Sequence, residues 1–143
     1  MTPGSRERAR ALLVKALYQW QLAGHTREEL LEQYAGLAEY GRVDQDYFSD
    51  LLGRVLAAAD ELDATIEHLA DRGLGQLDAV GHGILLLALA ELKFRDDVPV
   101  KVVINEAVKL AKRFGAHDSY RFVNAVVDRA SKTLRPPPEA TAG

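Results

Sequence analysis

Apolar residues recur at spacings of three and four along almost the whole chain, which is the pattern of helices that bury one face. No segment shows a convincing period-two alternation or an Asn-Gly hairpin signal. The longest apolar run, "ILLLALA" from Ile84 to Ala90, is apolar on most sides and indicates a central, buried helix. The pattern therefore predicts an all-α helical bundle.

Start and stop residues divide this pattern into separate helices. Thr26 and Glu29 have the spacing of a capping box, Asp44 is a start signal, and Gly73 is a stop. Pro99 stands where a first helical turn tolerates proline. We expect one helical domain over residues 1–135 and a disordered, proline-rich tail over 136–143. The predicted helices cover about 4–22, 27–40, 44–72 as one long helix or two consecutive ones, 74–94, 98–114 and 119–135.

Composition excludes several classes of protein. The chain has 143 residues, 48% of them hydrophobic and 27% charged, which is typical of one globular domain. It has no cysteine, so a disulfide scaffold and thiolate metal sites are excluded. Its longest apolar run is far shorter than the roughly 20 residues that span a bilayer. Lys15 and Gln19 interrupt the apolar residues near the start, unlike a signal peptide, so we expect a cytoplasmic protein without a membrane segment.

Motifs of catalysis and of cofactor binding are missing. The sequence has no glycine-rich phosphate loop after a strand and no nucleophile elbow. None of its histidines follows a glutamate by three residues, as the di-metal sites of helical bundles require. Asp78 and His82 lie one turn apart and are interpreted as a capping or surface pair. We therefore expect no enzyme, no metal and no cofactor.

The first helix combines a basic start with an aromatic ring outside its predicted core stripe. That stripe consists of Ala9, Leu12, Leu13, Ala16, Leu17 and Trp20. A separate outward line then carries Arg10, Val14, Tyr18 and Gln21, with Arg6, Arg8 and Lys15 around it. Cations beside an exposed ring can hold phosphates and stack a base. Glu7 weakens this field, and solubilising arginines beside a scattered surface tyrosine are the alternative.

Two segments near the C-terminus also place polar residues outside the core. One is a mostly basic stripe, which an ordinary solvated helix face would also explain; it contains Lys101, Asn105, Lys109 and Lys112. The other is "AKRFGAHDSYRFVNAV", in which Gly115 ends a helix and Asp118 or Ser119 caps the next. This arrangement leaves the side chains of Tyr120, Phe122 and Asn124 at the flanks of the apolar stripe. Net charge is -3, so binding to nucleic acid requires such a local patch.

The chain resembles the NusB family of bacterial antitermination factors over almost its whole length. The resemblance rests on "RERARALLVKALYQWQL", "YFSDLLGRV", "ALAEL", "VPVKVVINEAVKLAKRFG", "DSYRFVNAVVD" and the closing "RP". It implies about seven helices in two packed subdomains. It also implies binding to the boxA segment of ribosomal RNA leaders, together with a small-subunit ribosomal protein acting as NusE, within an RNA polymerase antitermination complex.

Position by position, the resemblance implies an RNA surface made of Arg6, Arg8, Arg10, Tyr18, Asp118, Phe122 and Asn124. The sequence departs from the family at Glu7 inside the arginine run, and at Gly81 and Leu86, where related chains often carry charges. The departures at Gly81 and Leu86 suggest an altered contact with the ribosomal protein. A protein-interaction adaptor with weak or no RNA binding remains the alternative function, and self-association stays open.

Overall fold

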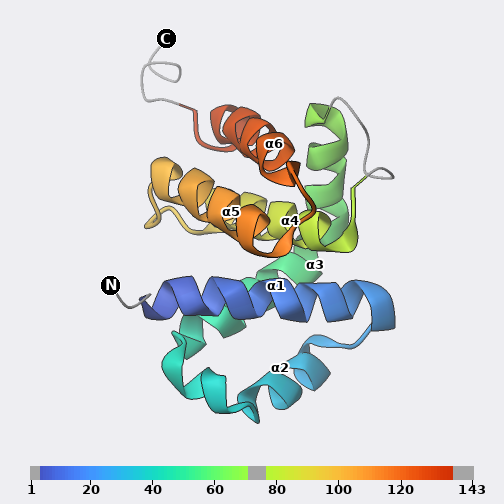
Figure 1. Cartoon of the computed structure of the whole chain (residues 1–143), viewed down its shortest axis with the longest axis vertical. Helices are drawn as coiled ribbons and strands as arrows, with labels where there is room; N and C mark the ends of the chain where they lie inside the picture. Colours follow the sequence, from blue (N-terminus) through green and yellow to red (C-terminus); the bar gives the residue numbers. More distant parts are fainter. Residues whose placement is uncertain (1–3, 71–76, 137–143) are drawn as a thin grey trace.

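The computed structural model describes residues 4–70 and 77–136, and these residues form helices joined by short connections (Figure 1). The all-α prediction is confirmed, since no strand occurs among the described residues. About seven helices were expected; this part of the chain has six α-helices and one 3-10 helix, η1. In chain order the elements are α1 (Ser5–Ala23), α2 (Arg27–Ala35), η1 (Ala38–Arg42), α3 (Gln45–Leu69), α4 (Ala79–Phe94), α5 (Val100–Phe114) and α6 (Ser119–Leu134).

The helices form two packed subdomains that share α3. In Figure 1, α1 lies across the middle of the molecule, with α2 and η1 below it and α4, α5 and α6 above it. The long helix α3 runs behind them and packs against α1 and α2 as well as against α4 and α6. Because α1 also packs against α4 and α5, it is covered from both subdomains.

Helix α4 is the centre of the core, as its apolar sequence predicts. All residues from Ile84 to Leu92 are buried, and α4 contacts α1, α3, α5 and α6. Each fully buried leucine contributes about 1.5–3 kcal/mol because its side chain leaves water. Leu86 is fully buried and Gly81 is buried beside Leu77, so neither residue forms a surface for a partner.

Trp20 on α1 was predicted in the core stripe, but it is only partly buried at the core's edge.

Helix starts follow the predicted caps with one exception, described below. Glu29 N–H donates to Thr26 Oγ1 at 3.1 Å and Thr26 N–H donates to Glu29 Oε1 at 2.9 Å, which confirms the capping box. Asp44 accepts from the backbone N–H of Tyr47 at 3.0 Å and starts α3. Asp78 accepts from Gly81 N–H at 2.7 Å, so its interpretation as a cap is confirmed. The predicted stop at Gly73 and the predicted tail beyond residue 136 lie outside the described residues.

His82 joins three helices rather than forming a pair with Asp78. Its Nε2 lies 2.5 Å from Asp63 Oδ1 on α3, and its Nδ1 lies 2.8 Å from Gln21 Oε1 on α1. Gln21 Nε2 donates to the carbonyl oxygen of Ala79 at 2.8 Å, which fixes the orientation of its amide. The contact is a structural link between α1, α3 and α4.

Arg135, just after α6, holds the end of α4 in place. Its guanidinium donates to the carbonyl oxygens of Leu92 at 2.9 Å, Glu91 at 2.9 Å and Arg95 at 2.6 Å, and also to that of Val98. The last carbonyls of a helix have no partner within the helix. One side chain thus satisfies the carbonyl of Leu92, gives those of Glu91 and Arg95 a second donor, and ties the last helix to the central one.

Candidate nucleic-acid interface

Arg10 does not face solvent, and its predicted place on an outward line of α1 is wrong. Its side chain is buried, and its Nε donates to Glu91 Oε2 on α4 at 2.9 Å. The Tyr47 hydroxyl donates to the same carboxylate, and burial raises the pKa of this phenol, so it keeps its proton. The physical reason for the error is that α4 covers the side of α1 which carries Arg10 and Val14.

Arg6 belongs to the same network. Its guanidinium lies 4.4 Å from the centroid of the Tyr47 ring, and its Nη1 lies 3.0 Å from Asp97 Oδ2. Arg95 lies 4.7 Å from that centroid and donates to both oxygens of Asp97 at 3.0 Å. These hydrogen bonds, chiefly those from Arg95, lower the pKa of Asp97 to about 2. We call this cluster the tyrosine junction; it consists of Arg6, Arg10, Arg95, Tyr47, Asp44, Asp50, Asp97 and Glu91.

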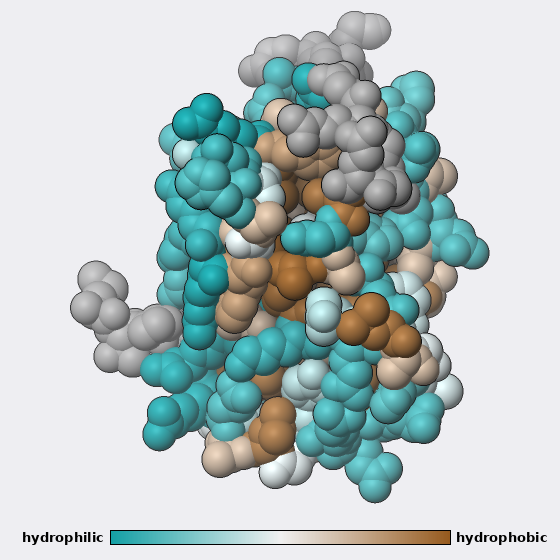
Figure 2. Space-filling model, turned by 45° about the vertical axis from the view of Figure 1, so that its right-hand side comes forward, coloured by the Kyte–Doolittle hydropathy of each residue, from teal (hydrophilic) through white to brown (hydrophobic). Residues whose placement is uncertain are grey.

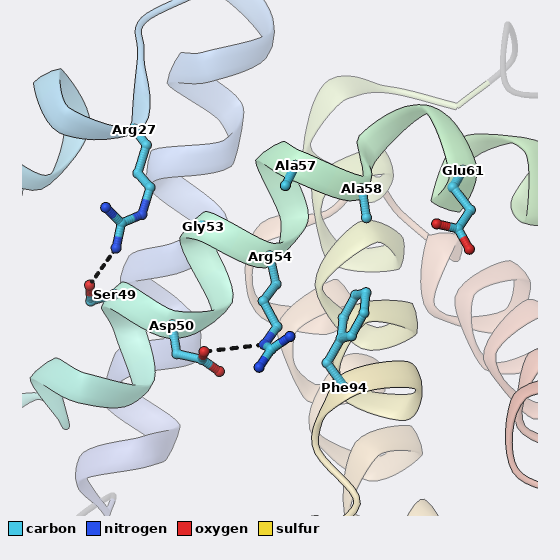
Figure 3. A pocket seen from close by; sticks show the side chains of 9 residues that line it. All are labelled: Arg27, Ser49, Asp50, Gly53, Arg54, Ala57, Ala58, Glu61 and Phe94. Atoms are coloured by element: carbon cyan, nitrogen blue, oxygen red, sulfur yellow. Dashed lines mark hydrogen bonds and ion pairs between the residues drawn. The ribbon is translucent and has the colours of Figure 1, made fainter.

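A shallow groove on α3 continues the tyrosine junction (Figure 3). Its floor has small side chains beside Phe94, and Figure 3 shows Arg27 reaching from α2 across Gly53 to Ser49. A Cβ at Gly53 would lie 2.7 Å from Arg27 Nε, so any other residue at this position would make the Arg27 side chain shift. Arg54 in the groove pairs with Asp50 at 3.2 Å. The cation on α3 thus has a carboxylate partner, as the arginines of the tyrosine junction have.

A hollow between α1 and α5 gathers more cations than the groove on α3 does. Its volume is about 550 Å³, and Arg8, Lys15, Lys109, Lys112 and Arg113 contribute cations to its lining. Glu7, which sequence alone suggested would weaken the field, pairs with Lys109, and this hydrogen bond lowers the pKa of Glu7. The negative charge inside the arginine run is therefore already balanced from α5.

Three cations on α5 and α6 contact aromatic rings instead of acids. Lys112 Nζ lies 4.8 Å and Arg121 Cζ 5.8 Å from the centroid of Tyr120, and Arg113 Cζ lies 4.6 Å from that of Phe114. Among residues 4–70 and 77–136, no carboxylate lies within 4.0 Å of these three cations. A ring attracts a cation without cancelling its charge. We call this surface the basic face; its cations are Arg8, Lys15, Lys109, Lys112, Arg113 and Arg121.

Three hollows make the basic face continuous. Lys15 lines both the α1–α5 hollow and a more apolar one that contains Tyr18, Leu22, Val80 and Phe114. Lys109 and Lys112 line both the α1–α5 hollow and a groove that contains Tyr120 and Asn124. In Figure 2, apolar side chains reach the surface in the middle of the side where α1 ends and α4 begins, with hydrophilic side chains around them. Tyr18 is 43% exposed and Leu22 is 66% exposed.

Asp118 starts α6 but does not cap it with its side chain. Its φ of 65° is left-handed, which aspartate tolerates better than most residues, and no hydrogen bond joins its side chain to the helix. Its carboxylate lies 3.4 Å from His117 Nε2 instead. The predicted side-chain cap is therefore wrong. Gly115 ends α5 as predicted, and a Cβ there would lie 2.5 Å from Ser119 Oγ, so glycine permits this tight turn.

The structure brings only some of the residues predicted to bind RNA together. Arg8, Tyr18 and Asn124 lie on the basic face, and Phe122 is partly buried against the core. Arg6 and Arg10 belong to the tyrosine junction. The predicted RNA surface did not include Lys112, Arg113, Tyr120 and Arg121, although the sequence placed Lys112 in a basic stripe and Tyr120 at the flank of the core. Their contact could not be predicted, because a lysine and a tyrosine eight residues apart in sequence have no periodic relation that indicates contact. No group of three or more residues that could hold a metal ion occurs among the described ones, and none of their helices could cross a membrane.

The fold and this face define an all-helical protein whose described residues form an extended cationic surface and a separate junction of paired charges around Tyr47. The sequence profile of the NusB family matches residues 7–132, and the chain therefore belongs to the NusB family. The chain is 44% identical over 134 residues to the transcription antitermination protein NusB of Alcanivorax borkumensis, covering 94% of this chain and 89% of that protein. It is 45% identical over 135 residues to the protein of that name from Proteus mirabilis, with 94% and 98% covered.

Solved structures agree with this family. NusB from T. maritima superposes with a TM-score of 0.80 at 29% identity, covering 99% of this chain and 100% of that one. A NusB chain from a crystal structure of the antitermination factors NusB and NusE in complex with double-stranded RNA superposes with a TM-score of 0.74. That chain is 24% identical, with 89% of this chain and 96% of that one covered, so it supports the fold alone.

Proposed function

We propose that the protein is a transcription antitermination factor that binds single-stranded boxA RNA through its basic face, as one subunit of a pair with a NusE-type ribosomal protein. It acts by binding and catalyses no reaction. The relatives' shared name, transcription antitermination protein, supports the process. The solved complex of a NusB with NusE and RNA supports the kind of partner. Because such a factor acts on transcripts as they are made, we expect it to work in the cytoplasm, on an RNA polymerase antitermination complex.

The observation that carries this proposal is the pairing of Lys112, Arg113 and Arg121 with rings instead of carboxylates. Such cations keep their positive potential, and their binding to RNA phosphates releases the counterions of the RNA. Cations already bound to carboxylates gain little from phosphate. The basic face can thus attract RNA even though the net charge of the chain is -3.

The path of the RNA follows the three hollows. Tyr18 offers an exposed ring on which one base can stack, and Lys15 lines the same hollow, while Arg8 lines the next hollow along α1. Lys15 also lies 3.7 Å from Glu39, so it contributes less to phosphate binding than the cations beside rings do. The strand then continues past Lys112 toward Asn124, with Phe122 and Asp118 at the start of α6. Arg6 and Arg10 hold α1 in position through the tyrosine junction and do not bind phosphate themselves.

A salt-dependent titration tests the proposal. Labelled boxA RNA is titrated with the chain, alone and with the NusE-type protein, at several salt concentrations. The double variant Lys112→Ala/Arg121→Ala should bind more weakly and reduce the salt slope by up to about two units, one for each phosphate that no longer has its cation. Arg54→Ala is the matched control, because it removes one exposed cation from the groove on α3.

The control should keep the salt slope of the wild type. If the wild type binds no boxA RNA with or without its partner, the alternative of a protein-interaction adaptor replaces this function. If RNA binds but Arg54→Ala lowers the slope as much per charge as the double variant, the RNA does not follow the basic face.

A further inference from the structure

The groove between α5 and α6 contains an unusual set of polar side chains. Its volume is about 550 Å³, within the range of about 300–1,000 Å³ that is typical of small-molecule sites. Both asparagines of the chain line it, Asn105 from α5 and Asn124 from α6. They face the same groove although 19 residues separate them.

These two amides have unused hydrogen-bonding capacity. Both residues are exposed, and neither side chain forms a hydrogen bond with any residue in the described part of the chain. Each amide offers an acceptor oxygen and a donor nitrogen side by side, which suits the donor and acceptor pattern of a base edge. Neither asparagine is needed to cap α5 or α6, since both lie inside their helices.

The groove also holds an aromatic ring and cations in fixed positions. Tyr120 packs partly against the core, and Arg121 Nε lies 3.3 Å from its hydroxyl oxygen. Lys112 lies over the ring of Tyr120, and Lys109 lines the same groove. Cations bind phosphate, while amides and a ring bind a base, so the groove combines what one nucleotide requires.

We propose that this groove is a binding site for one unpaired nucleotide, in which Asn105 and Asn124 bind the base edge and Lys112 and Arg121 bind the phosphate. The proposal rests on the RNA-binding function above and adds a site for base recognition to it. An acidic peptide would satisfy the cations, and its backbone could hydrogen-bond the amides, but it has no flat base to pack on the ring of Tyr120, so the observations favour RNA.

A double-mutant cycle between protein and RNA tests the site. Labelled boxA RNA is prepared with a single abasic nucleotide at each position in turn, which removes one base and keeps its phosphate. Each RNA is titrated with the full-length wild type, with Asn105→Ala/Asn124→Ala, and with Gln45→Ala as a control for loss of an exposed amide on α3. Alanine favours helix more than asparagine does, so the double variant should keep its fold, which its melting temperature checks.

We expect one position at which the abasic nucleotide weakens wild-type binding by roughly tenfold. The double variant should bind intact RNA more weakly by a similar factor and show no further loss at that position, whereas Gln45→Ala should behave as the wild type does. Equal abasic effects in the double variant and the wild type at every position would refute the nucleotide site and leave the RNA-binding function standing.

Two other outcomes also refute the site. If a polyglutamate peptide competes for the groove as well as an RNA of equal charge does, and the double variant abolishes this competition, the groove binds acidic peptides. If the wild type binds no RNA even with its NusE-type partner, the proposed function and the nucleotide site both fail.

Discussion

The tyrosine junction and the basic face both place cations beside a tyrosine ring, but only the cations beside the Tyr47 ring of the junction also bind carboxylates. The carboxylates of the basic face pair instead with Lys15 and Lys109. Arg6, Arg10 and Arg95 surround Tyr47, and each of them also binds an aspartate or glutamate. On the basic face, Lys112 and Arg121 surround Tyr120 without such a partner among the described residues. Cations beside a tyrosine ring therefore stabilise the fold at the tyrosine junction, whereas on the basic face they offer their charge to a ligand.

Burial explains why the two clusters differ. Arg10 is 4% exposed and Glu91 is 2% exposed, and a buried charge is stable only when it is paired. Lys112 and Arg121 are exposed, so water solvates them and no carboxylate is required. Four experiments test whether the two clusters differ in this way, and the variant that should change the protein most comes first.

Arg10→Ala should have the largest effect. It leaves Glu91 buried without its cation, and breaking a buried pair in this way costs about 3–5 kcal/mol of unfolding free energy. Urea unfolding followed by circular dichroism measures the loss. If the variant keeps near-native stability but loses RNA affinity, Arg10 binds RNA and the buried pair is not what stabilises the fold.

Arg113→Ala and Arg6→Ala should have opposite effects. Arg113→Ala should lower the salt slope of RNA binding by up to about one unit and hardly change stability, because its guanidinium lies over the Phe114 ring and pairs with no carboxylate among residues 4–70 and 77–136. Arg6→Ala should cost about 1 kcal/mol of stability and leave the slope unchanged, because its charge is bound by Asp97 and Asp44. Parallel titrations and melting curves decide; equal salt slopes for the two variants would erase the distinction between the clusters.

Asp118→Asn should tighten RNA binding by a few-fold at low salt, since it removes a negative charge from the start of α6. Its stability should stay near that of the wild type, because asparagine also tolerates a left-handed φ and no side-chain cap is lost. Asp118→Ala should lose about 1 kcal/mol through backbone strain alone. Weaker RNA binding by Asp118→Asn than by the wild type would place the RNA away from this turn.

The smallest expected effect is a dependence on acid pH. The pKa of Asp97 falls from 3.8 to about 2 on folding, so the unfolded chain takes up this proton first. The ion pairs of Asp97 therefore stabilise the fold above about pH 4, and this contribution is lost as the pH falls through about 2. Asp97→Asn should be less stable than the wild type at pH 5, and the difference should shrink toward pH 2.

Urea midpoints across this pH range measure the effect. Asp60→Asn is the control, because Asp60 forms no ion pair with any described residue. A constant difference between Asp97→Asn and the wild type at every pH would show that these ion pairs contribute nothing.

Local sequence was sufficient to predict most of the fold. The capping box at Thr26, the starts at Asp44 and Asp78 and the buried run of α4 all depend on residues close together in the chain. The site was less predictable. A helical wheel assumes one buried side, whereas α1 is covered from both subdomains, and the partner of Arg10 is 81 residues away.

In the turn before α6, too, local sequence did not predict the partner of a side chain, although this partner is close in the chain. An aspartate before a helix usually caps it, but here the tight passage from Gly115 to Ser119 places Asp118 in a left-handed conformation that turns its carboxylate to His117. The contact of Tyr120 with Lys112 also depends on how α6 folds back on α5. Such contacts follow from tertiary packing and leave no periodic signal in the sequence.

The position of Arg135 has a consequence for the order of events during translation. The carbonyl groups at the end of α4 emerge from the ribosome more than 40 residues before the arginine that binds them. Until Arg135 appears, the carbonyl oxygen of Leu92 lacks this partner, whereas those of Glu91 and Arg95 already accept from backbone N–H groups. The last turn of α4 should therefore become fully fixed only when synthesis has passed α6, and in a nascent chain interrupted before this residue α6 would pack less firmly on α4.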